Sequence, residues 1–549
     1  MPGGERKRWC GHSRPGWRFQ HCGCYYTRGI HHGQRRDWVR NRRSYINHIG
    51  LHNYRRKYSM KWVIAIVAIF LLPSWVWAVD HTVCSSGCDH TTIQACDDWA
   101  SRGDSCTVSA GTYAERVTVT TAASGTDTIT FTADGVVNMQ GFLIQADYII
   151  VDGFTISNPT DCSGETTWLA VKRACAGVQI EGDYVTVQNN TITNCEGEGI
   201  SAATTGYTTP LNATITNNTI SYTGLCGIKI HGANHLVNDN EISHTVQLTS
   251  DTLRASGGAD SDGIRAFGDS HTIRNNYVHD ILFTDTNNQS DTNAASHIDC
   301  FQTWGPATNI VYERNTCVDS TATGGVQGMI IVENNATVND FIIRYNVFAT
   351  LDNAVGYGPA ITISYDGAGG GEVENFDILN NTIVNQGGDY SNYGIRLREV
   401  NGGSIKNNIF YNCGYVSSSY IYVESDNLNL DIGYNLVYST GDAPSGGAYM
   451  DVTNCTAADT PYDCCTGAGA GATCAETDIW MDDPEFSNFS ANNFHLQSTS
   501  PAIDAGTDLS LTTDCDGNTV PVGALPDIGA YEYDPATIRG CTISGGSIQ

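Results

Sequence analysis

The sequence is short of positive charge. Its 549 residues include 58 Asp and Glu but only 29 Lys and Arg. Of those basic residues, 14 fall within the first 59 positions, where Glu5 and Asp37 are the only acids. The chain after residue 78 therefore keeps 14 basic against 56 acidic residues, a net charge of about −42. Such a surface repels nucleic acid, so the composition excludes a nucleic-acid partner and makes every outward-facing Lys or Arg worth attention.

The apolar stretch after the basic start is typical of a secretory signal peptide. Residues 60–78 begin with Met60 and Lys61, continue in an apolar run and end in Ala78. A basic start, a short apolar core and a small terminal residue are the features that signal peptides share. An uncleaved membrane anchor is the alternative, because the run is just long enough to cross a bilayer. With cleavage after Ala78 the protein is secreted or held at the cell surface without a membrane span, and residues 1–59 are a basic non-domain extension, or an overlong reading of a gene that starts at Met60.

Cysteines are concentrated in the exported part, which holds 17 of the 20. Export makes disulfides the expected state, and the absence of paired CxxC motifs disfavours zinc. Two clusters stand near the two ends of the exported part: Cys84, Cys88, Cys96 and Cys106, and Cys455, Cys464, Cys465 and Cys474. Further plausible pairs are Cys162 with Cys175, Cys195 with Cys226, and Cys515 with Cys541, although spacing does not decide connectivity. The odd count leaves at least one thiol, for which Cys300 is the candidate.

A segment centred on asparagine recurs nine times. Its members are Asn190, Asn218, Asn240, Asn276, Asn315, Asn346, Asn381, Asn408 and Asn435, at intervals of 22 to 39 residues. These intervals indicate a structural repeat with loops of variable length. Apolar residues flank each asparagine, which indicates a strand, a tight bend and a second strand, because Asn tolerates left-handed backbone angles. Stacked Asn side chains can also bond from coil to coil, at about 1 kcal/mol each.

A further strand precedes each asparagine segment, and alternation of its residues predicts which side chains face inward. The predicted inward residues are Val178, Ile180, Ile200, Ala202, Ile228, Ile230, Ile264, Ala266, Ile298, Cys300, Met329, Ile331, Ile361, Ile363, Ile395, Leu397, Ile421 and Val423. The predicted outward residues are Gln179, Ser201, Lys229, Arg265, Asp299, Ile330, Thr362, Arg396 and Tyr422. Two strand columns in parallel register, with no helical periodicity between them, leave few folds open.

This pattern resembles the right-handed parallel β-helix proteins, the architecture of pectate, alginate and chondroitin lyases and of polygalacturonases. The resemblance implies an all-β solenoid, with residues 79–146 as amino-terminal cap and first coils and 147–440 as the parallel β-helix; we expect a monomer. Capping is needed because an open sheet edge would recruit other chains. Residues 441–549, with Asp527-Ile-Gly-Ala-Tyr-Glu-Tyr533, resemble the carboxy-terminal segment of secreted bacterial β-helix proteins that is associated with surface anchoring. We expect this segment to cap the last coils.

Cationic and acidic residues coincide on the outward positions of three successive coils. Lys229, Arg265 and Asp299 are predicted to lie side by side, because strands of a β-helix stack about 4.8 Å apart. His297 stands two residues before Asp299, and two long polar insertions enter the column here. A row of exposed Lys, Arg and Asp can be a surface salt bridge worth under about 1 kcal/mol. Long loops on a rigid scaffold, however, are typical of a functional site.

The pair Lys229 and Arg265 resembles the Lys and Arg of the alginate and chondroitin lyases of this fold. Those enzymes break uronic-acid chains by β-elimination, taking a proton from the carbon beside a carboxylate whose charge Ca²⁺ or cationic side chains neutralise. The resemblance implies Lys229 as base with Arg265 in support, and we expect Asp299 and His297 to complete the site. Predicted substrate contacts are His231, Phe267, Phe301, Gln302 and Trp304. Candidate calcium ligands are Asp260, Asp262, Glu196 and Glu198, although Glu196-Gly197-Glu198 lies one coil earlier than the Glu-x-Glu it resembles.

Three alternatives remain open at this point. An inverting glycoside hydrolase is one, because Asp262 and Asp299 on adjacent coils could stand at the roughly 6.5–9.5 Å that such enzymes need. A C5-epimerase using His297 and Asp299 is another. The third, from a different class, is a non-enzymatic solenoid that binds glycans or cations. The expected partner is an acidic polysaccharide or a cell-surface glycan.

Overall fold

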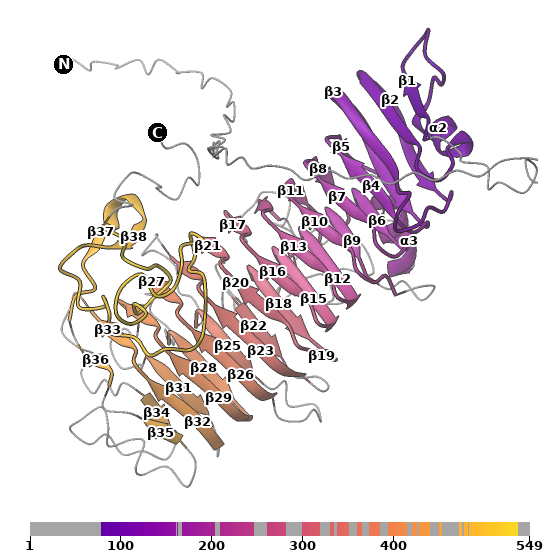
Figure 1. Cartoon of the computed structure of the whole chain (residues 1–549). Coiled ribbons are helices and arrows are strands. Elements are labelled where there is room, and N and C mark those ends of the chain that lie inside the picture. Colours follow the sequence, from indigo (N-terminus) through magenta and orange to yellow (C-terminus); the bar gives the residue numbers. More distant parts are fainter. Residues whose placement is uncertain are drawn as a thin grey trace, which may run out of the picture. The chain divides into compact units, whose positions relative to one another are not determined.

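The structure is a computed structural model of the chain (Figure 1). The described residues all belong to the second of two compact units, Val76–Gln549. They are 78–160, 162, 167–203, 209–245, 261–281, 299–318, 330–333, 338–350, 359–364, 373–384, 393–413, 420–424, 428–439, 450–452, 472–474, 477–480 and 482–535. The predicted basic extension and signal peptide, apart from Ala78, lie outside them. Over these ranges no helix is long and apolar enough to cross a membrane.

Short strands stack in three parallel rows, one strand of each row per coil (Figure 1). The first row is β6 (Val178–Ile180), β9 (Ile200–Ala202), β12 (Ile228–Ala233), β15 (Ile264–Asp269), β18 (Phe301–Trp304), β22 (Ile330–Glu333), β25 (Ile361–Ser364), β28 (Ile395–Arg398), β31 (Ile421–Glu424) and β34 (Met450–Val452). The second is β4 (Ile149–Asp152), β7 (Thr186–Gln188), β10 (Thr214–Thr216), β13 (Leu236–Asn238), β16 (Thr272–Arg274), β20 (Val311–Glu313), β23 (Val338–Arg344), β26 (Val373–Leu379), β29 (Val400–Lys406), β32 (Leu428–Gly433) and β35 (Ala472–Cys474). The third is β5 (Thr155–Ser157), β8 (Thr191–Cys195), β11 (Thr219–Thr223), β14 (Glu241–Ser243), β17 (Tyr277–His279), β21 (Thr316–Val318), β24 (Val347–Ala349), β27 (Thr382–Val384), β30 (Ile409–Tyr411), β33 (Leu436–Tyr438) and β36 (Ile479–Trp480). This is a parallel β-helix, as the sequence predicts; the asparagine segment supplies two of its rows.

The beginning of the solenoid is built from β1 (Asp80–Val83), the helix α2 (Ile93–Trp99) and two long strands, β2 (Ser105–Val119) and β3 (Ile129–Ile144). β3 is long enough to pair with β4, β5 and β6, one strand of each row. Disulfides join Cys84 to Cys88 and Cys96 to Cys106, which confirms the predicted cluster. With Cys162–Cys175 and Cys300–Cys317, four disulfides occur among the described residues and indicate an oxidising compartment.

Alternating apolar residues of all three rows fill the interior of the solenoid. Most of the predicted inward residues are fully buried, among them Ile228, Ile230, Ile264 and Ala266. Alternation succeeds because successive strand residues point to opposite faces. The predicted pair Cys195 and Cys226 is not joined, although both residues are buried. Cys455, Cys464, Cys465 and Cys541 lie outside the described residues.

All nine repeated asparagines form one continuous ladder. From Asn190 to Asn408, each Nδ2 donates to the Oδ1 of the next asparagine at 2.9–3.1 Å. Asn435 ends the ladder on Asp478 Oδ1, at 3.3 Å. The left-handed backbone falls on the residue before each ladder asparagine, as at Asn217 (φ 55°). The prediction of a bonded Asn stack is therefore confirmed, with the tight bend one residue earlier.

A second, shorter ladder of imidazoles joins the first and second rows. His235 and His271 are buried and stacked, with ring centroids 4.9 Å apart. His271 Nδ1 accepts the His235 backbone N–H at 3.1 Å, and its Nε2 lies 2.7 Å from the Phe267 carbonyl. Burial lowers the pKa of His235 to about 4 and that of His271 to about 3. Both rings are therefore neutral near pH 7, and they hydrogen-bond to the backbone of neighbouring coils.

The register of the first row differs from the prediction at two coils. Arg265 pairs with Gln302, and Gln302 with Ile331. The prediction that Asp299 stands beside Arg265 is therefore wrong by three residues, and the prediction that Ile330 points outward is wrong by one, because Ile330 is fully buried. Cys300 forms a disulfide with Cys317 of β21, so it is not the unpaired thiol. Cys300 immediately precedes β18, and the disulfide holds the chain there against the third row.

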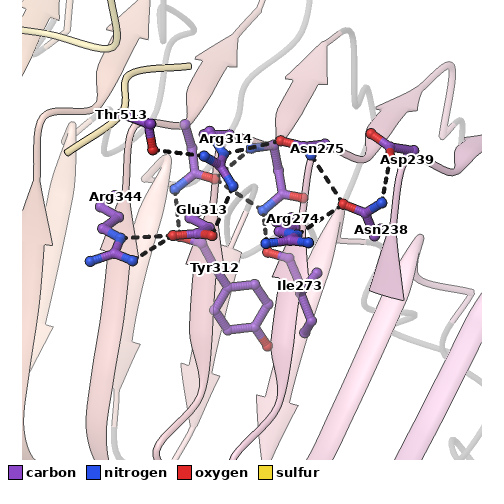
Figure 2. Close-up of polar contacts among 12 residues, drawn as sticks. Asn238, Asp239, Ile273, Arg274, Asn275, Tyr312, Glu313, Arg314, Arg344 and Thr513 are labelled. Carbon is purple, nitrogen blue, oxygen red and sulfur yellow. Dashed lines mark hydrogen bonds and ion pairs between the residues drawn. The ribbon is translucent and has the colours of Figure 1, made fainter. Parts of the chain in front are cut away.

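The carboxy-terminal segment packs against the outer face of the third row. It contains β37 (Phe486–Asn488), the 3₁₀ turn η3 (Phe489–Ala491) and β38 (Asn493–Leu496). Its apolar residues Phe486, Phe494, Ile528 and Tyr531 cluster with Val347, Ile409 and Leu436 of the solenoid. Polar contacts extend to the second row, where Arg314 donates to Thr513 Oγ1 at 2.9 Å beside Glu313 and Arg344 (Figure 2). The segment therefore contacts the outer faces of several successive coils.

Candidate active site

Lys229 and Arg265 are immediate neighbours on the outer face of the first row. They pair in parallel register between β12 and β15. Ser201 occupies the same position on the coil before, and Gln302 on the coil after. Two successive cations in a chain this poor in positive charge therefore stand side by side, as predicted, while the third predicted member, Asp299, is replaced by Gln302.

The amine of Lys229 is electrostatically unusual. The side chain is half-buried, and its Nζ lies 5.5 Å from the centre of the Phe267 ring. Burial lowers the pKa of Lys229 to about 8, helped by the positive charges of Lys172 and Arg265 and opposed by Glu198. A lysine whose pKa is near 8 is partly unprotonated at neutral pH and can then accept a proton, whereas an ordinary lysine is almost fully protonated.

Arg265 is held from below by a buried carboxylate. Its Nε donates to Asp262 Oδ2 at 2.8 Å, and Asp262 is fully buried. Asp262 Oδ1 in turn accepts the backbone N–H of Asp299 at 3.1 Å, and Asp299 is also fully buried. Because neither carboxylate reaches the surface, the predicted hydrolytic pair cannot approach a polymer in this structure, and Asp262 supports Arg265 instead.

Sequence reasoning missed a third cation at this site. Lys172 lies on helix α3 (Trp168–Cys175), and its Nζ is 4.0 Å from Glu198 Oε1. Both residues are buried, at 6% and 1% exposure. The signal that could have found Lys172 is its rarity, because it is one of 14 basic residues after position 78. A helix that interrupts the repeat has no place in the strand register, so the repeat spacing does not predict which side chains Lys172 lies near.

Several polar atoms around Lys229 are buried without a hydrogen-bond partner. They are Glu198 Oε2, Ser201 Oγ, His231 Nδ1 and Gln302 Oε1, with Gln179 Oε1 further along the row. A buried polar group left unpaired costs about 1–3 kcal/mol, so native proteins keep few of them without a reason. Their concentration on the outer face of the first row is typical of a site that binds a polar ligand.

The predicted substrate contacts divide into two groups. His231 and Phe267 pair in register beside Lys229, with ring centroids 6.1 Å apart, and both are half-buried. Phe301 was predicted to face a sugar, but it points inward, is 1% exposed and packs edge-on against Tyr312. This correction follows from the register, which places Phe301 opposite inward-facing Ile264. Trp304 ends β18 in register with Glu333, and its side chain lies outside the described atoms.

The candidate calcium ligands do not converge among the residues that the structure describes. Asp262 is bound to Arg265, Glu198 faces Lys172, and Glu196 Oε2 accepts the Cys162 N–H at 2.9 Å. Within the described ranges no group of three or more His, Cys, Asp or Glu side chains could hold a metal ion. Asp260 and His297 lie outside these ranges, so a calcium site involving Asp260 and a catalytic role for His297 stay predictions.

Residues 97–303 match one protein family. Its description is "Protein of unknown function (DUF1565)". The matched range contains Lys172, Lys229, Arg265 and Gln302. None of the curated proteins compared with the chain matches it.

Solved structures with a similar fold include carbohydrate-active proteins at low identity. The complex of XylC with xylose is 12% identical over 74% of this chain and 87% of that chain, with a TM-score of 0.44. A PL6 alginate lyase in complex with a trisaccharide is 15% identical over 72% and 83%, with a TM-score of 0.44. The pectate lyase Pel9A is 12% identical over 83% and 96%, with a TM-score of 0.41. Likeness at this level does not indicate a reaction.

Proposed function

We propose that this protein is an exported polysaccharide lyase that cleaves a uronic-acid-containing chain by β-elimination at the Lys229 site. The observation that carries the proposal is the Lys229 amine, whose pKa is lowered to about 8 beside the Arg265 guanidinium. A neutral amine next to fixed positive charge is what this elimination requires, because the proton to be removed lies beside a carboxylate. The disulfides Cys84–Cys88 and Cys96–Cys106 indicate that the protein resides in an oxidising compartment, which fits a secreted or cell-surface location.

The proposed reaction assigns a role to each described side chain. The Lys229 amine takes the proton from the carbon beside the uronate carboxylate, and Arg265 and Lys172 stabilise the developing negative charge through their own charges. The electron pair left on that carbon forms a double bond to its neighbour as the glycosidic C–O bond breaks. The leaving oxygen takes a proton from water, and Lys229 later returns its own proton to the solvent. Burial and the nearby lysines lower the pKa of His231, so this ring is neutral. His231 and Phe267 are half-exposed and line the place where the sugar would bind.

A product assay on a panel of uronate polymers tests the proposal. Alginate, pectate and chondroitin are incubated with the exported chain, and both the ultraviolet absorbance of unsaturated uronate and new reducing ends are measured. Elimination yields both signals together, so at least one polymer should give them. Reducing ends without the absorbance would indicate a hydrolase and overturn the proposal, as would the absence of both across the panel.

A non-enzymatic glycan-binding protein is the second candidate, favoured by one observation. Arg265 and Gln302 are 4% and 1% exposed, so among the described residues of this site only Lys229, His231 and Phe267 offer half-exposed side chains. A binding protein would slow in a gel that contains the glycan and release no product. Retardation without either product signal would therefore select this candidate.

A further inference from the structure

Two histidine side chains meet at the beginning of the solenoid. His81 lies in β1, and His90 lies between β1 and helix α2, where its backbone forms a parallel bridge with Val83. Nε2 of His90 is 3.3 Å from Nδ1 of His81, and the ring centroids are 5.3 Å apart. Both side chains are half-buried, so solvent and small ions can reach them.

The backbone and a disulfide fix the position of both histidines. The N–H of His90 donates to the Thr82 carbonyl at 3.0 Å, and the N–H of Cys84 donates to the His90 carbonyl at 3.1 Å. The Cys84–Cys88 disulfide closes the turn between these segments. Asp89 joins them again, because its Oδ2 accepts the Thr82 N–H at 2.9 Å. The two rings are therefore brought together by the fold of the first coil.

The separation of the two ring nitrogens is that of two ligands on one metal ion. In a tetrahedral zinc site two nitrogen ligands stand about 3.3 Å apart, because each lies about 2.0–2.1 Å from the ion. Imidazole nitrogen is also a ligand type that zinc favours in proteins. The neighbouring cysteines are joined in the Cys84–Cys88 and Cys96–Cys106 disulfides, so they do not supply thiolate ligands.

A buried carboxylate stands behind His81, as it does behind many metal-binding histidines. Nε2 of His81 lies 3.4 Å from Asp104 Oδ2, and Asp104 is 3% exposed. Asp104 is itself held by the N–H groups of Val79 and Ser101, each at 2.8 Å. A carboxylate in this position orients the ring and favours a proton on the nitrogen that faces it. Nδ1 of His81, the atom that faces His90, is then unprotonated and available to an ion.

We propose that Nδ1 of His81 and Nε2 of His90 bind a zinc ion, with water completing its tetrahedral coordination. The ion takes the place of the proton that lies between the two nitrogens, and His90 then carries its proton on Nδ1. Bound zinc links β1 to the segment that leads into α2. The site has two protein ligands, which is compatible with the absence of any group of three or more among the described residues. It does not depend on the proposed function, because it lies on the first coil and involves no residue of the Lys229 site.

Zinc uptake by the exported chain, prepared without an affinity tag, tests the site. Equilibrium dialysis against Zn²⁺ is carried out on wild type, His81→Gln, His90→Gln and the control His495→Gln. His495 is a half-buried histidine whose Nε2 is bonded to Asp516 at 2.7 Å. Wild type and His495→Gln should bind one equivalent that His81→Gln and His90→Gln both lose. No uptake by wild type, or full uptake by folded His81→Gln or His90→Gln, would overturn the proposal.

A second measurement uses wild type alone and decides the matter if the substituted chains do not fold. Histidines are modified with diethyl pyrocarbonate, with and without Zn²⁺, and the modified positions are mapped by peptide mass spectrometry. Zinc should slow modification of His81 and His90 and leave that of His495 unchanged, because a ring nitrogen bound to the ion cannot react. Modification of His81 and His90 at the same rate with and without zinc would contradict the site. Neither measurement requires elimination activity, so the zinc site and the lyase proposal can fail separately.

Discussion

At the scale of single residues, the repeated asparagines explain why a chain with short, irregularly spaced strands forms one regular solenoid. Each ladder asparagine is buried, and its Nδ2 also reaches a backbone carbonyl, as from Asn276 to Val237 at 3.0 Å. Each coil is thereby held to its neighbour at the same point, whatever the length of its loops. The ladder positions could be predicted from the sequence because the same residue, asparagine, stands at the equivalent position of every repeat.

We expect Asn276→Ala to lower the free energy of unfolding by about 1–3 kcal/mol, because it leaves the amides of neighbouring coils unpaired. The measurement is chemical denaturation followed by far-ultraviolet circular dichroism. Asn339→Ala, on a half-exposed asparagine of β23 outside the ladder, is the matched control and should change stability by less than about 0.5 kcal/mol. Equal effects of the two substitutions would show that the ladder does not stabilise the coils.

At the scale of elements, the sequence predicted strands well and their register less well. Alternation gives the facing of a strand such as Gly227-Ile-Lys-Ile, where a polar residue separates two apolar ones. It fails at Met329-Ile-Ile-Val332, because a continuous apolar run has no preferred face and a slip of one residue goes unnoticed. The error at Asp299 has another cause: the Cys300–Cys317 bond, which places Phe301 inside, cannot be read from spacing. The candidate site was therefore located on the correct strands, but with the wrong third member and without Lys172.

The imidazole ladder should make the central coils sensitive to acid. The pKa values of His235 and His271 lie near 4 and 3 in the folded chain, below the ordinary 6.5. Unfolding then takes up protons, so their contribution to stability is complete above pH 6.5 and is lost as the pH falls through that value towards 4. Hydrogen exchange of the β13 and β16 amides should quicken between pH 7 and about 4.5 relative to β27. An equal change in β27 would contradict a local role for these histidines.

The carboxy-terminal segment should respond to pH in the opposite direction. Burial raises the pKa of Asp527 to about 6 and that of Glu532 to about 7, from ordinary values of 3.8 and 4.5. Their contribution to stability is therefore complete below pH 3.8 and is lost as the pH rises to about 7. We expect exchange of the amides of Ile528 and Ala530 to be faster at pH 8 than at pH 5, after correction for intrinsic rates. Asp527→Asn should reduce this difference, and an unchanged difference would assign the effect elsewhere.

At the scale of the whole molecule, the charge distribution sets a condition on any polyanionic substrate. The chain after residue 78 carries about −42, whereas Lys172, Lys229 and Arg265 gather at one site. A polyuronate must therefore approach a repelling molecule to reach an attractive site. Such long-range repulsion changes association rates more than it changes the chemistry of bound substrate.

Moderate salt should accordingly speed turnover of a polyuronate. The screening length falls from about 10 Å at 0.1 M salt to about 3 Å at 1 M, which removes the repulsion over distance before it removes contacts within the site. We expect kcat/KM on a long polymer to rise between low and moderate sodium chloride, and to rise less on a short oligosaccharide. A steady fall with salt on both substrates would indicate that attraction to the cations governs binding.

The central claim is that the Lys229 amine removes the substrate proton. Its most direct test is the initial rate of unsaturated uronate formation by wild type, Lys229→Met and Arg396→Met. Arg396 is the matched control, because it is a half-exposed cation at the same outward position of the first row, three coils after Gln302. The account predicts a loss of at least about a hundredfold in Lys229→Met, with Arg396→Met close to wild type and all three proteins folded. Full activity in folded Lys229→Met would contradict it.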